Sequence, residues 1–131
     1  MKPVTLEQEI AREQKKAKSR AARKPPLEDT QQIDFIAWAR KHAELVWHTP
    51  NARKYSRAAW AYWNAMGVEP GILDIFLLIR GVRMAIEFKR PGEKPTAKQR
   101  RVGEILARYG YEVAFVYSSE EAKNFVMEKA R

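Results

Sequence analysis

The sequence has no cysteine, which excludes disulfide frameworks, thiolate zinc sites and cysteine nucleophiles. It has no apolar run long enough to cross a bilayer and no apolar block near its start of the kind that marks a secretory signal. Acidic residues are the minority, 16 against 25 Lys and Arg. We therefore expect a soluble cytoplasmic protein, in which any metal is held by oxygen or imidazole groups.

The 131 residues suit one compact domain, and a hydrophobic fraction of 45% is enough for a core. The net charge of +9 favours a polyanionic partner, because Lys and Arg gain affinity by releasing counterions from phosphates. Much of this charge lies in residues 1–24, which contain eight Lys or Arg and three Glu. We interpret residues 1–26 as a basic N-terminal arm, mobile or partly helical, that either solubilises the chain or tethers it to DNA.

Two helices are expected in the first half of the chain. Apolar residues recur at helical spacing over about 29–47, and Thr49-Pro50-Asn51 then breaks the pattern. A second helix is predicted from Ser56 to Gly67, with Trp60 and Trp63 as its packing anchors.

The second half alternates strands and helices. Residues 73–79 and 83–89 are β-rich runs joined by a short turn, which is typical of an antiparallel hairpin. A capped helix is predicted over 96–109, a third strand over 112–117 and a final helix over about 118–129. The order α-α-β-β-α-β-α indicates an α/β sandwich around a small mixed sheet.

The hairpin brings acidic residues together. If its turn is the two-residue loop Arg80-Gly81, Asp74 lies opposite Glu87, and such pairs have Cβ atoms about 4.5–5.5 Å apart. Lys89 projects from the same face, two residues beyond Glu87. Opposed carboxylates repel unless a cation compensates, and hard oxygen ligands suit Mg²⁺ or Mn²⁺. This register predicts a metal-dependent phosphodiesterase centre and gathers a separate apolar face from Ile75, Leu77, Ile79, Met84, Ile86 and Phe88.

Four ordered motifs carry a family resemblance: G-I-L-D at Gly71–Asp74, I-E-F-K-R at Ile86–Arg90, P-G-E-K-P-T-A-K-Q at Pro91–Gln99 and G-Y-E-V-A-F-V at Gly110–Val116. Together they resemble the VRR-NUC family of the PD-(D/E)XK nuclease superfamily, over about residues 28–121. The family usually has proline before the aspartate, where this chain has Leu73. The resemblance implies a restriction-endonuclease-like nuclease domain over residues 27–131.

In that family pattern Asp74 and Glu87 would be metal ligands, the main-chain carbonyl of Phe88 a further ligand, and Lys89 the catalytic lysine. The resemblance implies Mg²⁺- or Mn²⁺-dependent cleavage of structured DNA, such as branched junctions or flaps, by a stand-alone phage or bacterial protein. If the chain is phage-encoded, its place would be the host cytoplasm. A symmetric junction would be cut best by a two-fold dimer, so we also expect a homodimer.

Two further residues of the family pattern have simpler interpretations beside the catalytic one. Glu28 matches the acidic residue of the first helix, a tentative metal ligand, although Asp29 can take its place and an acid at a helix start also complements the helix dipole. Gln99 matches the family's glutamine, but three residues after Thr96 it also fits a capping box.

Eight basic residues are candidates for contacts with DNA phosphates: Arg53, Lys54, Arg57, Arg90, Lys94, Lys98, Arg100 and Arg101. Those within 51–57 fit a solvated loop and helix start almost equally well. His42 and His48 have no metal-ligand spacing, and we interpret them as ordinary surface histidines. Two alternatives stay open, a non-catalytic nucleic-acid-binding protein on the same fold and a sequence-specific restriction-type endonuclease.

Overall fold

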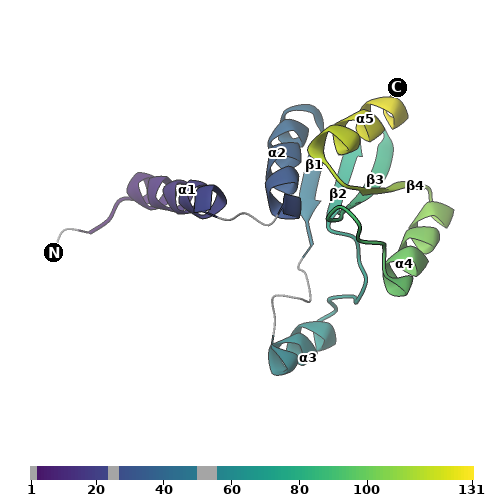
Figure 1. Ribbon diagram of the computed structural model, residues 1–131, viewed down its shortest axis with the longest axis horizontal. Coiled ribbons are helices and arrows are strands. Elements are labelled where there is room, and N and C mark those ends of the chain that lie inside the picture. Colours follow the sequence, from purple (N-terminus) through teal and green to yellow (C-terminus); the bar gives the residue numbers. More distant parts are fainter. Residues whose placement is uncertain (1–2, 24–26, 50–55) are drawn as a thin grey trace.

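The computed structural model describes residues 3–23, 27–49 and 56–131, with side chains described for all of these except 17–23, 27 and 28. At its centre is a mixed sheet with strand order β1-β2-β3-β4 (Figure 1). β1 and β3 are antiparallel to β2, whereas β4 is parallel to β3. The bounds are β1 (Leu45–His48), β2 (Ile75–Ile79), β3 (Val82–Phe88) and β4 (Tyr111–Val116).

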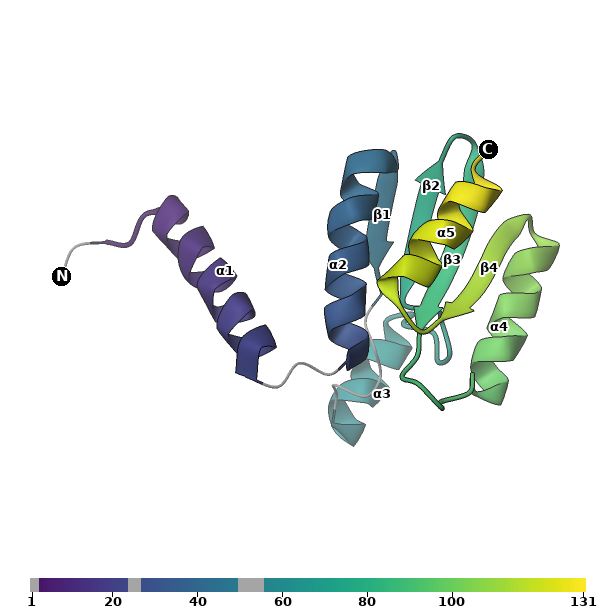
Figure 2. The same ribbon diagram turned by 45° about the horizontal axis from the view of Figure 1, so that its top comes forward.

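Helices cover both faces of the sheet. On one face, α2 (Leu27–His42) and α5 (Ser119–Lys129) enclose the main core with the apolar side chains that the hairpin register predicts (Figure 2). On the other face, α4 (Ala97–Arg108) packs over a smaller cluster around Leu73, Phe76 and Ala85. The predicted α/β sandwich around a small mixed sheet is confirmed.

The hairpin has the predicted turn and register. Arg80 and Gly81 both have positive φ, 48° and 78°, as the two central residues of a type I′ turn require. The ladder runs from Ile79 opposite Val82 to Ile75 opposite Ile86. One more step along this register sets Asp74 opposite Glu87, at the open end of the hairpin.

The predicted helix over 29–47 is wrong at its C-terminal end. α2 ends at His42, and Leu45–His48 form β1 on the edge of the sheet. In β1, Val46 packs towards the main core, while Trp47 stacks on Phe76 with ring centroids 5.5 Å apart. Alternation over four residues is too short to stand out from a helical pattern that runs into it, so the sequence pattern did not reveal this strand.

The remaining helices differ in how they pack. α1 (Leu6–Arg23) lies within the predicted basic arm and stands apart from the sandwich in Figure 1. α3 (Arg57–Ala65) starts after Ser56 as predicted, but none of its residues is buried and Trp63 is 40% exposed. Trp60 and Trp63 are therefore not core anchors. This nine-residue helix follows β1 and precedes β2 in the chain, and it projects away from the sandwich (Figure 1).

The crossover from β3 to β4 carries α4 to the open end of the hairpin. Thr96 caps α4 in a capping box with Gln99, as predicted. Gly71, in the loop before β2, lies against the same first turn of α4, where a Cβ on it would be 2.8 Å from the Lys98 Cβ. At the start of α5, the Ser118 side chain likewise accepts a hydrogen bond from a main-chain N–H of the first turn.

Among the described helices, none is both long and apolar enough to span a membrane.

Candidate active site

The two acidic residues meet at the start of β2 and the end of β3. The main-chain N–H of Asp74 donates to Glu87 Oε2 at 2.8 Å. Glu87 is buried with 3% of its surface exposed, and Asp74 is partly buried beside it. The predicted pair of opposed carboxylates is therefore present in the fold, with Glu87 shielded from water and Asp74 partly open to it.

Burial and mutual repulsion change how this pair ionises. Burial, followed by the charge of Asp74, raises the pKa of Glu87 to about 8. Burial also raises the pKa of Asp74, although its hydrogen bond with Glu87 and the charge of His48 oppose the shift. Near neutral pH the two carboxylates therefore share a proton when no cation is bound. A divalent cation would replace that proton, so the donor set fits Mg²⁺ or Mn²⁺.

Lys89 places a buried ammonium beside the pair. Its side chain is 1% exposed, and its Nζ lies 3.9 Å from Glu87 Oε1. Its main-chain N–H donates to the carbonyl of Val116 at 2.8 Å, which continues the pairing of β3 with β4. Strand geometry thus turns Lys89 to the same face as Glu87, as the two-residue spacing predicts.

Gln99 makes the predicted capping box and also contacts Glu87. Its Oε1 accepts from the main-chain N–H of Thr96 at 3.0 Å, which is the capping box. Its Nε2 donates to Glu87 Oε1 at 2.8 Å. The amide therefore uses its two ends for different purposes, so the cap of α4 also fixes the orientation of the Glu87 carboxylate.

His48 and Thr49 lie at the site, although the sequence pattern assigned them no role there. His48 Nδ1 is 3.0 Å from the main-chain oxygen of Asp74, and Thr49 donates to that oxygen from its main-chain N–H at 2.7 Å. Gln32 of α2 lies 3.2 Å from the same ring nitrogen. Recognising 45–48 as a strand paired with β2 would have placed His48 beside Asp74; no spacing motif marks it.

The remaining predicted site residues are either exposed or outside the described part of the chain. Glu28 lies in the first turn of α2, but its side chain is outside the described residues, as are Arg53 and Lys54 altogether. Over the described part of the chain, no three acidic, histidine or cysteine side chains are grouped tightly enough to hold a metal. The other candidate phosphate contacts are exposed: Arg57, Arg90, Lys94, Lys98, Arg100 and Arg101.

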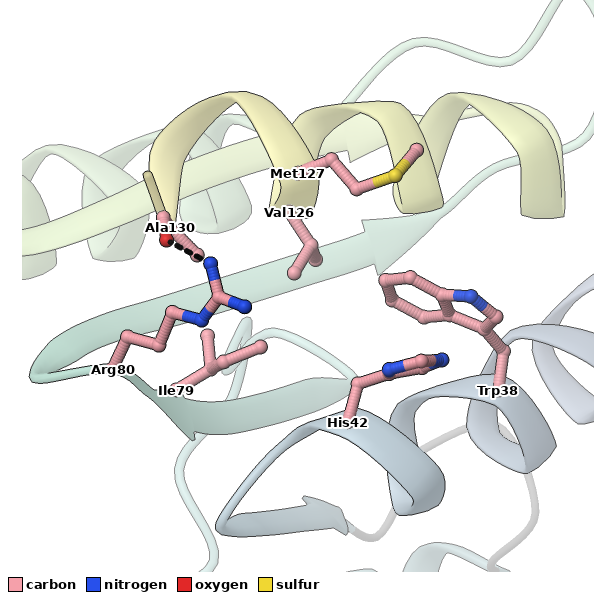
Figure 3. A pocket seen from close by; sticks show the side chains of 7 residues that line it. All are labelled: Trp38, His42, Ile79, Arg80, Val126, Met127 and Ala130. Atoms are coloured by element: carbon pink, nitrogen blue, oxygen red, sulfur yellow. Dashed lines mark hydrogen bonds between the residues drawn. The ribbon is translucent and has the colours of Figure 1, made fainter.

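A separate hollow of about 380 Å³ lies at the opposite end of the hairpin (Figure 3). Trp38 and His42 of α2 form one wall, and Val126 and Met127 of α5 form another. Arg80 crosses its edge and donates to the carbonyl of Ala130 at 3.4 Å. It contains none of the predicted site residues, so the acidic cluster and this hollow are different features.

Comparison with solved structures finds a chain described as a VRR_NUC domain protein, with a TM-score of 0.62 over 82% of this chain and 89% of that one. The fold is that of a VRR_NUC domain protein. The sequences are 21% identical, so the likeness is one of fold. No family model and no curated protein matches this chain. The VRR-NUC fold nevertheless agrees with the predicted restriction-endonuclease-like architecture and with the motif order that suggested it.

Proposed function

We propose that this chain is a divalent-metal-dependent nuclease that hydrolyses phosphodiester bonds in DNA. The observation that carries the proposal is the carboxylate pair of half-buried Asp74 and buried Glu87, with the ammonium of Lys89 3.9 Å from Glu87. A fold has no structural need for two opposed carboxylates in a buried site, because they repel each other. The VRR-NUC fold supports the same interpretation.

Each residue has a distinct task in this proposal. Asp74 and Glu87 would hold Mg²⁺ or Mn²⁺, with the main-chain carbonyl of Phe88 and the Glu28 carboxylate as further ligands. When bound, the cation supplies polarisation of the phosphoryl group and a lower pKa for the attacking water. Lys89 orients that water or stabilises negative charge on the phosphate. Gln99 keeps the Glu87 carboxylate turned towards the centre through its 2.8 Å hydrogen bond.

DNA is the proposed substrate because the chain carries a net charge of +9 and exposed basic residues follow the site in sequence. These residues suit phosphates and DNA shape better than base edges, so we propose low base specificity and a preference for branched junctions or flaps. A symmetric four-way (Holliday) junction would favour a homodimer, and such substrates occur in DNA repair.

The two alternative functions make different demands. A non-catalytic DNA-binding protein on this fold has no use for Asp74 beside the buried pair Glu87 and Lys89. A restriction-type endonuclease would need an additional element that reads bases, within a chain of 131 residues. A nuclease of low base specificity accounts for the site residues and needs no additional element that reads bases.

A cleavage assay tests the proposal on junction, flap, single-stranded and linear duplex DNA, with Mg²⁺, Mn²⁺ or EDTA. We expect cleavage with either cation, strongest on branched DNA, and none with EDTA. Asp74→Ala and Lys89→Met should be inactive, whereas Lys129→Met, at an ion pair on the surface, should cleave normally. Cleavage that persists in EDTA or in both site variants would contradict the assignment. Light scattering that finds a monomer, free and on DNA, would contradict the dimer.

A further inference from the structure

The main-chain carbonyl of Asp74 is held by the end of β1. Thr49 donates to it from its main-chain N–H at 2.7 Å and from its hydroxyl at 3.3 Å, and the same hydroxyl donates to the carbonyl of Leu73 at 2.5 Å. His48 Nδ1 lies 3.0 Å from the Asp74 oxygen. These contacts lie just outside the β2 ladder, whose pairing with β1 ends at His48 and Ile75. The residue that carries the predicted ligand is thus fixed by a neighbouring strand.

Two contacts of His48 Nδ1, with the Asp74 carbonyl and with the Gln32 amide, bear on which ring nitrogen carries hydrogen. A carbonyl oxygen can only accept, so the contact to Asp74 is a hydrogen bond only if Nδ1 is protonated. The Gln32 amide also lies against Nδ1, at 3.2 Å, and two N–H groups cannot bond to each other. In the structure the Gln32 atom that faces the ring is Nε2, so a hydrogen on Nδ1 requires the Gln32 amide to be turned over, with its oxygen accepting the Nδ1 hydrogen together with the Asp74 carbonyl.

The main-chain N–H of Asp74 has a different kind of partner. It is bound by the Glu87 carboxylate, a side chain that must itself face the cation in the proposed nuclease. The carbonyl is instead bound by groups that have no other task in the site. Partners of this kind orient metal ligands, and losing one typically costs about 10- to 100-fold in metal affinity or activity.

We infer that His48, through Nδ1–H and together with Thr49, is a positioning residue that holds the backbone of Asp74 so that its carboxylate meets Glu87. The inference deepens the proposed nuclease function and rests on Asp74 being a metal ligand. Gln32 extends the same support to α2, so the helix that carries Glu28 is tied to the acidic pair through the His48 ring.

Three substitutions of His48 distinguish the effect of its Nδ1–H donor from the effect of the volume of its ring. His48→Asn places an amide nitrogen close to the position of Nδ1, His48→Gln places it near Nε2, and His48→Leu removes the donor. Titration calorimetry with Mn²⁺ in the absence of DNA should give an affinity about 10- to 100-fold weaker for Leu and Gln, but within about threefold of wild type for Asn. kcat should follow the same order, with KM for DNA unchanged. His42→Asn, on the far end of α2, is the control.

A second measurement uses the unaltered protein. Nitrogen-15 NMR of the metal-free chain should show hydrogen on Nδ1 of His48. The inference fails if the ring is the Nε2–H tautomer, if Asn is as weak as Leu, or if Leu keeps wild-type Mn²⁺ affinity and kcat. Should His48→Leu not fold, the comparison of Asn with Gln and the NMR result still decide. A wild-type chain that binds Mn²⁺ but cleaves no DNA would instead overturn the nuclease function alone.

Discussion

The main-chain N–H of Asp74 donates to the carboxylate of Glu87 at 2.8 Å, so one predicted metal ligand binds the backbone of the other. The contact follows from the hairpin register, which sets the two residues directly opposite each other. It also brings two carboxyl groups into a buried site where only one of them can readily ionise. The stability and the metal affinity of the chain should both depend on that conflict and on the groups around it.

Without metal, the protein should become less stable as pH rises from about 5 to 8. The pKa of Glu87 is raised from 4.5 to about 8, so in this window the folded chain binds a proton that the unfolded chain releases. Stability is therefore highest below the unfolded pKa, and it falls by up to about 1.4 kcal/mol per pH unit until the folded pKa is passed. Urea denaturation in EDTA measures this slope. Saturating Mg²⁺ should remove it, and a slope that Mg²⁺ leaves unchanged would contradict the proposed site.

Asp74→Asn should stabilise the metal-free protein while destroying activity. The charge of Asp74 is the second largest cause of the raised pKa of Glu87, after burial. Removing this charge should raise the free energy of unfolding by on the order of 1 kcal/mol at pH 8. The pH range over which stability falls should move lower. kcat should drop by roughly 100-fold or more, because a ligand matters at least as much as its supporting partners. A variant that is both less stable at pH 8 and active would refute this account.

The two tasks of Gln99 can be separated by substitution. Thr96→Ala removes the helix cap, at a cost of about 1 kcal/mol, but leaves the Gln99 contact with Glu87 in place. Gln99→Glu keeps a capping-box side chain but sets a third carboxylate against Glu87. Cleavage should therefore be nearly normal in Thr96→Ala and strongly reduced in Gln99→Glu. Equal activity losses that scale with thermal stability would show that Gln99 serves α4 alone.

Exposed cations beyond β3 should contribute to DNA affinity through phosphates. Lys94 and Arg101 are exposed, and Arg101 lies in the first half of α4. Replacing either by Ala should reduce the slope of log affinity against log salt by about one, equally for different DNA sequences. Fluorescence anisotropy in EDTA measures binding without cleavage. Arg108→Ala, at the other end of α4, is the matched control and should leave the salt slope as it is.

Gly71→Ala should weaken both the fold and the site. Gly71 has φ +77°, and an added Cβ would lie 2.8 Å from the Lys98 Cβ and 3.0 Å from its main-chain carbon. We expect a loss of roughly 1–3 kcal/mol, and weaker Mn²⁺ binding as the segment leading to Asp74 shifts. Gly92→Ala has a similar positive φ, +86°, with nothing within 4 Å, so thermal melts should show a smaller loss. Equal losses would mean that φ alone sets the cost.

Local rules were enough to predict the hairpin and α4 from the sequence. A two-residue turn fixes the register, and alternation then assigns every side chain to a face, so the order of residues alone placed Asp74, Glu87 and Lys89 together. The cap at Thr96 likewise starts α4 at the right residue. These features depend on residues that are close together in the sequence, so a short stretch of sequence is enough to predict them.

What the sequence did not reveal depends on contacts between distant segments. His48 reaches Asp74 across 26 residues, and a four-residue edge strand next to a helix gives little alternation to detect. The position of Trp60 and Trp63 outside the core was also hidden, because aromatic residues at helical spacing fit a core as well as a projecting helix. Gln99 shows a milder case, since its cap was visible but its contact with Glu87 required the crossover to fold back.

The hydrogen bonds that run from Gln32 through His48, Asp74 and Glu87 to Gln99 link α2, three strands and α4. Such long-range contacts form late in folding, because the entropy cost of closing a large loop comes before the favourable free energy of the contact. In a partly unfolded chain, the residues of the site are therefore present but are not yet brought together. In a cell, this order of events would keep the proposed nuclease inactive until its folding is finished.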